Sequence, residues 1–584
     1  MVRRTKIVCT IGPASETAET IRKMLLAGMN VARLNFSHGS HMEQKQRIQT
    51  LRSVASKLGY PLGILLDTRG PEIRIGTFKT GSVFLEEGKT FTLTTREIKG
   101  DNRRVAVQYA PFAEDVAVGD TILLDDGLIH LQVMATDGID VECRVIHGGR
   151  LSDRKKINLP DSRVSLPPLS EQDYKDLSFG VEHGIDYVAA SFIQRADEVL
   201  IIKRFLEEEG AEIPVLAKIE NAQGVGNLDA ILRVADGLMV ARGDLGVEVP
   251  AEEVPFLQKL MIKKCNRAGK PVITATQMLE SMVDKPRPTR AEASDVANAI
   301  LDGSDAVMLS AETATGSFPV EAVENMDRIS RRAEKELDYE GLLGRKSESP
   351  HQTITDAIGY ATCTTAHDLQ ANAILTATQS GYTPRMVARH RPRAPIIAVT
   401  PKGEVLRRLT LVWGVIPVLE AQSSDTDEML DKSVAAGLKG GYIKEGDLVV
   451  ITAGHPVGIP GTSNLLKVHT VGNVLLRGVG IGQRATTGRI CLGKTPRDFQ
   501  RNFQPGDILV TLMTDKEFMP FLEKASAIIT EGPGLTSHAA VVGLNLGIPV
   551  VVGAKGALEL LAKEDVVTVD GIRGLVYRGR ANVK

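Results

Sequence analysis

The sequence of 584 residues has few cysteines, few aromatic residues and no long apolar run. The lack of paired cysteine spacing excludes a disulfide framework and predicts reduced core thiols in a cytoplasmic protein. No apolar run approaches the ~18 residues that indicate a membrane-spanning helix. The basic start, MVRRTKIVCTIGP, has too short an apolar run for a signal peptide. The five cysteines are Cys9, Cys143, Cys265, Cys363 and Cys491.

The sequence also lacks an excess of either charge. Its formal net charge of -2 provides no basic surface field, so we expect neither nucleic acid nor a membrane as a partner. With 43% apolar and 24% charged residues, the composition is that of a soluble α/β protein. The length exceeds what a single hydrophobic core serves and predicts about three to four domains.

Short apolar strands that end in polar residues recur through the first 340 residues. Helical segments lie between most of them, and ETIRKMLLAG, ADEVLIIKRFLEEEG and VPFLQKLMIKKCNRAG each end at glycine. Alternation alone also fits an open doubly wound sheet, but eight strands favour a closed (β/α)8 TIM barrel with catalytic groups at the carboxyl ends. The strands are TKIVCTIGP, NVARLNFSHG, LGILLDTRG, DYVAASFI, PVLAKIEN, DGLMVARGD, PVITATQML and DAVMLSAET.

The domain organisation follows from where this alternation of strands and helices stops. Residues 1–70 and 169–340 form the predicted barrel, and residues 71–168 carry alternating runs broken by Asp-Gly turns. We predict that this insertion is a small β-barrel placed as a lid at the active-site face. A polar linker around residues 339–350 leads to a predicted α/β open-sheet regulatory domain over 346–473, and residues 475–584 form an extension.

Two strand ends predict a divalent-cation site. Lys218 and Glu220 are two apart on one strand, so both face the barrel interior. Glu220 and Asp244, from adjacent strand ends, can share Mg²⁺ or Mn²⁺, and Lys218 can neutralise charge on an enolate or a transferring phosphoryl group. Backbone N–H groups around Gly243 suit a substrate carboxylate. The alternative is a structural Lys–Glu ion pair.

Other strand ends supply arginines, hydroxyls and carboxylates. Two arginines near a metal suit phosphate recognition, and neutral and acidic oxygens suit a monovalent-cation cage. Groups at the seventh and eighth strand ends suit a proton relay, and all of these residues can alternatively be loop ion pairs or helix caps. The first set is Arg33, Asn35, Ser37, His38, Asp67, Thr68, Glu72 and Arg74, and the second is Thr276, Gln277, Ser310 and Glu312.

At these residues the sequence resembles the pyruvate kinase family, over about residues 1–473. The resemblance implies phosphoryl transfer from phosphoenolpyruvate to ADP, the last step of glycolysis, followed by protonation of the enolate. It also implies Mg²⁺ (or Mn²⁺) and K⁺ as cofactors, a phosphorylated allosteric effector and a homotetramer. The matching stretches, in the family's order and spacing, are MNVARLNFSHG, LDTRGPEIR, VLAKIENAQGV, MVARGDLGVE and TATQMLESM.

The resemblance implies a role for each matching residue. Lys218 would stabilise the transferring phosphoryl group, and Glu220 with Asp244 would hold Mg²⁺. A water relay through Thr276, Ser310 and Glu312 is suggested as the proton donor, and Thr276 would also position the substrate. The other matches are Arg33 and Arg74 for phosphates, Gly243 for the substrate, Asn35, His38, Arg74 and Arg195 for the nucleotide, and Asn35, Ser37, Asp67 and Thr68 for K⁺.

Three further positions refine the comparison. Glu72 matches the K⁺-dependent members of the family, whereas K⁺-independent members carry Lys there, so K⁺ dependence is predicted. Arg195 and Thr315 stand where many members have Lys, and the change at Thr315 predicts the loss of a nucleotide contact.

The second α/β domain contains a candidate effector loop in TATQSGYTPRMVARHRP, residues 376–392. A strand there turns into a helix, with Pro384 expected at the first helical position, and the turn offers backbone N–H groups and hydroxyls to a phosphate. Gln379 and Tyr382 differ from the fructose-1,6-bisphosphate loop of many relatives, so another phosphorylated effector, such as AMP or a sugar monophosphate, is at least as good a candidate. A solvated turn is the alternative. The candidate contacts are Thr378, Ser380, Gly381 and Thr383.

The extension contains GPGLTSHAAVV, which resembles the phosphohistidine domain of pyruvate phosphate dikinase, phosphoenolpyruvate synthase and enzyme I of the phosphotransferase system. Residues 534–538 match the carrier motif, but Pro533 replaces its first glycine and restricts the backbone. A dikinase-like phosphotransferase that uses His538 as carrier is therefore an alternative function. Because the sequence shows one phosphoenolpyruvate site and no recognisable ATP-grasp domain, we expect the extension to be structural or regulatory.

Overall fold

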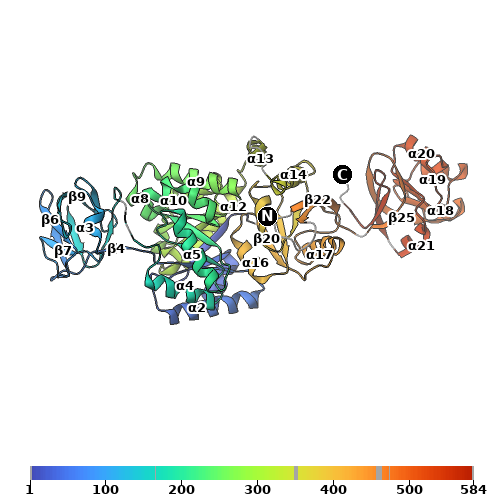
Figure 1. Cartoon of the computed structure of the whole chain (residues 1–584). Coiled ribbons are helices and arrows are strands. Elements are labelled where there is room, and N and C mark those ends of the chain that lie inside the picture. The colour runs from blue at the N-terminus through green and yellow to red at the C-terminus, as the bar shows by residue number, and fades with distance from the viewer. Residues whose placement is uncertain are drawn as a thin grey trace. The chain divides into compact units, whose positions relative to one another are not determined.

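The computed structural model describes residues 3–162, 164, 166–347, 353–454, 463–472, 474–563 and 565–581. The chain divides into two compact units. The first comprises Met1–Leu342, Ala388–Arg391 and Lys402–Pro417, and the second comprises Leu343–Val387, Pro392–Pro401 and Val418–Lys584. Figure 1 traces the chain through both units and labels their main helices and strands.

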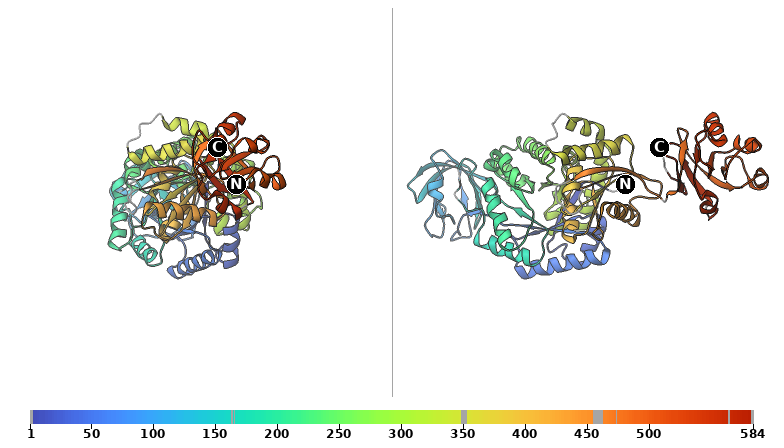
Figure 2. Two further views of the ribbon diagram at one scale, coloured as in Figure 1. Left: turned by 90° about the vertical axis from the view of Figure 1, so that its right-hand side faces the viewer. Right: turned by 45° about the vertical axis from the view of Figure 1, so that its right-hand side comes forward.

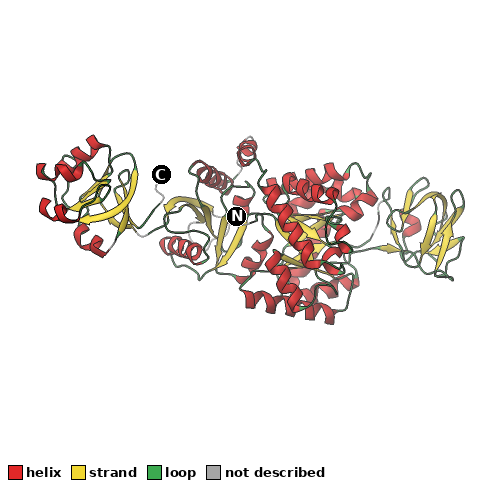
Figure 3. Cartoon of the chain, turned by 180° about the vertical axis from the view of Figure 1, so that it is seen from behind, coloured by secondary structure: helices red, strands yellow, loops and turns green. Residues whose placement is uncertain are grey.

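The first unit contains the predicted closed barrel of eight parallel strands, in the order β1-β17-β16-β15-β14-β13-β3-β2. Each strand falls within one of the predicted segments, so the fold prediction is confirmed. Figure 3 shows these strands, in yellow, enclosed by red helices. The strands are β1 (Lys6–Thr10), β2 (Val31–Asn35), β3 (Gly63–Asp67), β13 (Tyr187–Ala190), β14 (Val215–Ile219), β15 (Gly237–Ala241), β16 (Val272–Ala275) and β17 (Ala306–Leu309).

Alternation along the barrel strands separates two apolar clusters. Val31, Leu65 and Leu216 belong to the cluster that fills the barrel interior, whereas Ala32 and Ala217, one residue along, pack in the layer under the helices. This period of two decides which polar residues at the strand ends face the interior.

The helices around the barrel are capped by side chains at their starts and by glycine at several of their ends. Ser40, Ser170 and Thr289 each form a capping box at a helix start, while Gly28 and Gly269 cap two helix ends. The longer helices are α1 (Ala18–Ala27), α2 (His41–Leu58), α4 (Glu171–Glu182), α5 (Ala196–Glu208), α9 (Val254–Ala268), α10 (Arg290–Asp302) and α12 (Pro319–Glu334). The shorter ones are α6 (Ala222–Gly226), α7 (Leu228–Val234), α8 (Arg242–Glu248), α11 (Ala311–Ala314) and α16 (Gly403–Arg408).

The insertion between β3 and β13 is a small barrel, as predicted. Its seven-stranded sheet has the order β4-β12-β8-β9-β10-β6-β7, and a bridge between Ile75 and Val107 joins the two edges. The right-hand view of Figure 2 shows these strands in light blue. The elements are β4 (Ile73–Arg74), β5 (Ser82–Leu85), β6 (Thr90–Thr94), β7 (Arg104–Ala106), α3 (Phe112–Asp115), β8 (Thr121–Leu124), β9 (Ile129–Thr136), β10 (Asp140–His147), β11 (Gly149–Ser152) and β12 (Lys156–Asn158).

The α/β domain that follows is an open sheet in the order β20-β19-β18-β21-β22, again as predicted. Two local predictions are wrong. Residues 339–347 of the expected polar linker form α13, and Pro384 is the third residue of α15 rather than its first. The elements are α13 (Tyr339–Ser347), α14 (Ile354–Asp368), β18 (Ala373–Ala377), α15 (Tyr382–Ala388), β19 (Ile396–Thr400), β20 (Val415–Leu419), α17 (Thr426–Lys439), β21 (Leu448–Gly454) and β22 (Ser463–Thr470).

The extension folds around an eight-stranded sheet with apolar clusters on both faces. Within the described parts of the chain, no helix combines the length and the apolar character needed to span a bilayer. The strands are β23 (Val474–Arg477), β24 (Val479–Ile481), β25 (Ala485–Leu492), β26 (Ile508–Thr511), β27 (Ala527–Thr530), β28 (Val550–Val552), β29 (Val566–Asp570) and β30 (Leu575–Arg578). The helices are α18 (Pro496–Asn502), α19 (Met519–Leu522), α20 (His538–Leu546) and α21 (Ala557–Leu560).

Candidate active site

A cavity of about 430 Å³ lies at the carboxyl ends of the barrel strands. Its lining brings together the residues predicted for both cations and the two arginines predicted for phosphates. Ser191 and Phe192 also line the cavity but were not among the predicted residues. They directly follow β13, so their position at a strand end is a signal that could have identified them. The predicted residues in the lining are Arg33, Asn35, Ser37, His38, Asp67, Thr68, Glu72, Arg74, Lys218, Glu220 and Asp244.

Asp67 is the buried centre of the cavity's charge network. It ends β3 on the interior face and is 1% exposed. Arg33 Nε donates to its Oδ2 at 2.6 Å, and Lys218 Nζ donates to its Oδ1 at 3.0 Å. Lys218 Nζ also donates to Ser191 Oγ at 2.7 Å and lies 3.2 Å from Glu220 Oε1. The ends of four strands, β2, β3, β13 and β14, are thus tied together by charge-assisted hydrogen bonds.

These contacts decide the protonation of the two central groups. Burial lowers the pKa of Lys218, but the carboxylates of Asp67 and Glu220 raise it by more, so it lies above the usual value. Burial raises the pKa of Asp67, but Arg33 and Lys218 outweigh burial and hold it below the usual value. The ammonium and the carboxylate are therefore both charged at neutral pH.

Glu220 is held by a strained neighbour. Its Oε2 accepts a hydrogen bond from the backbone N–H of Phe192 at 2.6 Å, and Phe192 has a φ of +56°. A positive φ at a bulky residue is costly and is typical of functional sites. Burial raises the pKa of Glu220, partly offset by the charge of Lys218.

Asp244 is the third residue of α8 and meets a partner from the insertion. The ammonium of Lys156 contacts Asp244 Oδ1 and lies 4.4 Å from the centroid of the Phe192 ring. Lys156 carries no motif that would single it out in the sequence. It opens β12, and its contact depends on how the insertion returns to the barrel.

Thr276 also has strained backbone geometry. Its φ is +65°, and that of Gln277 is +53°, although Thr276 is β-branched. Thr276 Oγ1 accepts a hydrogen bond from the N–H of Gly243 at 2.9 Å and donates to the carbonyl of Ala275 at 2.6 Å. Thr276 therefore holds the first turn of α8 in place at Gly243, the residue directly before Asp244.

Besides Gly243, Thr276 and Gln277, three further predicted residues fall outside the cavity lining: Arg195, Ser310 and Glu312. Glu312 accepts from the N–H groups of Ser310 and Leu279 at 2.6 and 3.1 Å, which supports the helix-cap alternative, and burial raises its pKa. The Oγ of Ser310 is buried without a hydrogen-bond partner among the residues that the structure describes. Arg195 pairs with Asp197 and Glu198 at the start of α5 and is 48% exposed. Thr315, where the resemblance predicts the loss of a nucleotide contact, caps the end of α11.

The candidate effector loop is a tight turn between β18 and α15. Gly381 has a φ of +78° and donates its N–H to Thr378 Oγ1 at 2.9 Å. Thr383 Oγ1 is 2.6 Å from Ser463 Oγ, so both threonine hydroxyls already have protein partners. Ser380 is exposed.

In the extension, His538 is the first residue of α20, and the preceding Ser537 caps that helix. The Nδ1 of His538 shares a hydrogen bond of 3.1 Å with Thr514 Oγ1, and the side chain is half-buried. The histidine therefore sits at a helix terminus with one ring nitrogen already engaged.

A closed β/α barrel with a lysine, carboxylates and arginines at its strand ends is the architecture of an enzyme that acts on anionic substrates. Family models match "Pyruvate kinase, barrel domain" over residues 2–323, "Pyruvate kinase, alpha/beta domain" over 356–469 and "PEP-utilising enzyme, mobile domain" over 503–574. The chain belongs to the pyruvate kinase family.

Full-length relatives agree with the family models. Proteins named pyruvate kinase from Geobacillus stearothermophilus, Bacillus licheniformis and Staphylococcus aureus strain MRSA252 are 53%, 52% and 48% identical to the chain. Each match covers 100% of both chains, so the similarity includes the C-terminal extension.

Proposed function

We propose that this enzyme transfers the phosphoryl group of phosphoenolpyruvate to ADP, giving pyruvate and ATP as the last step of glycolysis. The observation that carries the proposal is the buried lysine network. Lys218 lies 3.0 Å from Asp67 and 3.2 Å from Glu220, on a cavity that Asp244 also lines. A lysine kept protonated beside two carboxylates suits the charge that develops in phosphoryl transfer.

The donor set fits the cations that this reaction needs. Glu220 and Asp244 would hold Mg²⁺ or Mn²⁺, because carboxylates on one wall suit these ions and lysine ammonium groups already contact both. Bound there, the ion stabilises negative charge on phosphoryl and enolate oxygens. The oxygens of Asn35, Ser37, Asp67 and Thr68, which line the same cavity, would hold K⁺.

The chain's own residues would divide the remaining work. Arg33 and Arg74 bind phosphate oxygens, with Asn35, His38 and Arg195 on the nucleotide side. An oxygen of the ADP β-phosphate attacks phosphorus, the bond to the enolate oxygen breaks, and Lys218 balances the charge. Thr276 holds the start of α8 at Gly243, where the substrate binds. A water relay through Thr276, Ser310 and Glu312 would then deliver a proton to the enolate carbon. The buried hydroxyl of Ser310 is available for it, since it has no hydrogen-bond partner within the described parts of the chain.

Regulation is proposed to use the turn of the α/β domain. Thr378, Ser380, Gly381 and Thr383 would contact a phosphorylated effector such as AMP or a sugar monophosphate, mainly through backbone N–H groups and the exposed Ser380. The active form is proposed to be a homotetramer in the cytoplasm.

A substitution in the extension distinguishes the proposed function from the dikinase-like alternative. We expect the full chain with His538→Ala to form pyruvate and ATP from phosphoenolpyruvate and ADP within about twofold of the wild-type rate, because His538 takes no part in the proposed transfer. A loss of at least about a thousandfold, the size expected when the Lys218 ammonium is removed, would favour His538 as a phosphate carrier. Retention of labelled phosphate on the wild-type chain but not on His538→Ala would point the same way.

We expect the activity to depend on K⁺. In the wild type, replacing K⁺ with a large organic cation should lower the rate by at least about tenfold, because the oxygen cage loses its ion. Glu72→Lys places an ammonium on the cavity wall and should reduce the dependence on K⁺. Glu86→Lys, at an exposed residue of the insertion outside the cavity lining, makes the same change of charge and serves as the control. Full wild-type activity in K⁺-free buffer would contradict the prediction.

A further inference from the structure

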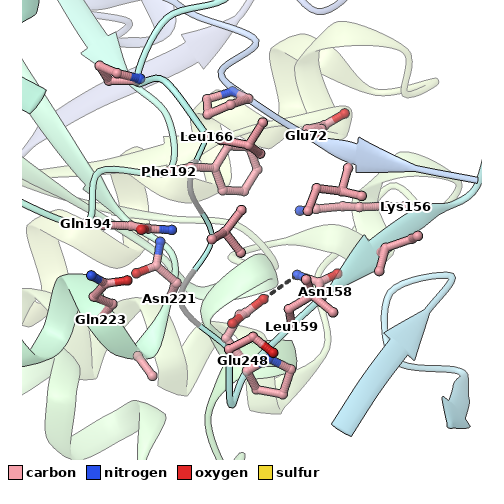
Figure 4. A pocket seen from close by; sticks show the side chains of 18 of the residues that line it. Glu72, Lys156, Asn158, Leu159, Leu166, Phe192, Gln194, Asn221, Gln223 and Glu248 are labelled. Atoms are coloured by element: carbon pink, nitrogen blue, oxygen red, sulfur yellow. Dashed lines mark hydrogen bonds between the residues drawn. The ribbon is translucent and has the colours of Figure 1, made fainter. Parts of the chain in front are cut away.

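One lysine of the insertion reaches into the proposed cation site. Lys156 pairs in register with Arg74, so it lies on the two-stranded tether, β4 and β12, through which the chain enters and leaves the insertion. Figure 4 shows its ammonium directed towards the ring of Phe192, in a cavity lined by both tether strands. The ammonium contacts Asp244, a proposed cation ligand on α8.

The contact is partly buried and held from two sides. The side chain of Lys156 is 11% exposed, and its ammonium meets a carboxylate and, at 4.4 Å, an aromatic face. The neighbouring Lys155 differs, since it is 39% exposed and pairs with Asp125 inside the insertion at 2.7 Å. A buried ammonium is costly without a compensating charge, so the Asp244 carboxylate stabilises Lys156 in this position.

A second contact holds the same tether without the proposed ligand. Asn158 Nδ2, two residues further along β12, donates to Glu248 Oε1 at 2.7 Å, shown by the dashed line in Figure 4. Both contacts end on α8. Breaking the Lys156 contact therefore leaves the tether with one polar anchor on that helix.

We propose that Lys156 is a positioning residue that occupies Asp244 while no divalent cation is bound and must leave it when the cation binds. This inference rests on the proposed role of Asp244. The ammonium and the cation need the same carboxylate oxygen. The apparent affinity for the cation is therefore the intrinsic affinity multiplied by the fraction of molecules in which that oxygen is free. The tether of the insertion thereby sets the cation affinity of the barrel.

The test measures Mn²⁺ binding to the full chain without substrates, from the electron paramagnetic resonance signal of free Mn²⁺. We expect Lys156→Met to bind Mn²⁺ about fivefold more tightly than the wild type, because the ion pair that competes with Mn²⁺ for the Asp244 carboxylate is then absent. Lys155→Met removes the same charge one residue away and should bind as the wild type does. Lys156→Gln is the second variant if Lys156→Met does not fold.

A structural readout accompanies the binding data. In the wild type, Mn²⁺ should speed backbone hydrogen exchange over residues 153–160, because one anchor of the tether is released. In Lys156→Met, exchange there should already be fast and should not respond to Mn²⁺. A response equal to that of the wild type would overturn the inference.

The Asp244→Asn variant tests the proposed role of Asp244 as a cation ligand separately from the competition by Lys156. If Asp244→Asn loses at least tenfold in Mn²⁺ affinity while Lys156→Met binds no more tightly than the wild type, the competition is refuted and the proposed site stands. If Asp244→Asn binds Mn²⁺ as the wild type does, the role of Asp244 fails and the inference fails with it.

Discussion

A Lys218→Met variant is expected to form pyruvate at least about a thousandfold more slowly than the wild type at saturating substrates. Methionine keeps the length of the side chain but removes the ammonium that lies between Asp67 and Glu220. A single preorganised donor at a site of developing charge is typically worth ~10²–10³ in kcat, and a full charge in a buried site is worth at least as much. The measurement is the rate of pyruvate formation from phosphoenolpyruvate and ADP.

The matched control is Lys203→Met, at a barrel-surface lysine that pairs with Asp236 at 2.8 Å. It should keep the wild-type rate, because Lys203 does not line the cavity. Circular dichroism should show that both variants are folded. A folded Lys218→Met variant with more than a tenth of the wild-type rate would refute the proposed role of the lysine.

An Asp67→Asn variant is expected to lose both stability and activity. Asp67 is the shared counter-ion of Arg33 and Lys218, and removing one member of a buried charge network costs on the order of 3–5 kcal/mol. The measurement is the midpoint of thermal unfolding. Ser191→Ala is the control within the same network: it removes a hydroxyl but no charge and should cost only about 1 kcal/mol.

The pH dependence of this stability difference follows from the sign of the pKa shift. The folded-state pKa of Asp67 lies below the usual value, because Arg33 and Lys218 outweigh burial. The stabilisation is therefore fully present above the unfolded pKa of about 3.9 and is lost as the pH falls through the folded pKa. The gap between wild type and Asp67→Asn should stay constant from about pH 5 to pH 8. A gap that closes within this range would show that Asp67 is not the charged partner.

The core of the candidate site was predictable because strand alternation and the geometry of a parallel barrel act together. A period of two along each strand places Arg33, Asp67, Lys218 and Glu220 on the interior face. A parallel barrel then gathers all of its strand ends at one rim, so residues far apart in the sequence must meet there. Neither the strand alternation nor the gathering of strand ends depends on a particular side-chain contact, so both can be recognised in the sequence.

Other features depend on contacts that no periodicity encodes. Lys156 reaches Asp244 only because β12 pairs with β4 and returns to the barrel beside α8. The positive φ angles of Phe192 and Thr276 arise where strands turn into helices under tertiary constraint, at residue types that normally avoid them. Pro384 shows the same limit locally, since its helix begins two residues earlier than the proline suggests.

The sequence by itself determined the eight-stranded barrel, the β-barrel insertion, the two further domains and most of the cavity lining. Strand alternation, glycine stops and polar strand ends are local signals that survive without knowledge of the fold. Only the tertiary structure decided which charges pair: Asp67 with Arg33 and Lys218, Asp244 with Lys156, and Glu312 with backbone N–H groups. The physical reason is that the strength and protonation of a charge depend on burial and on neighbours within a few ångströms, and those neighbours come from distant parts of the chain.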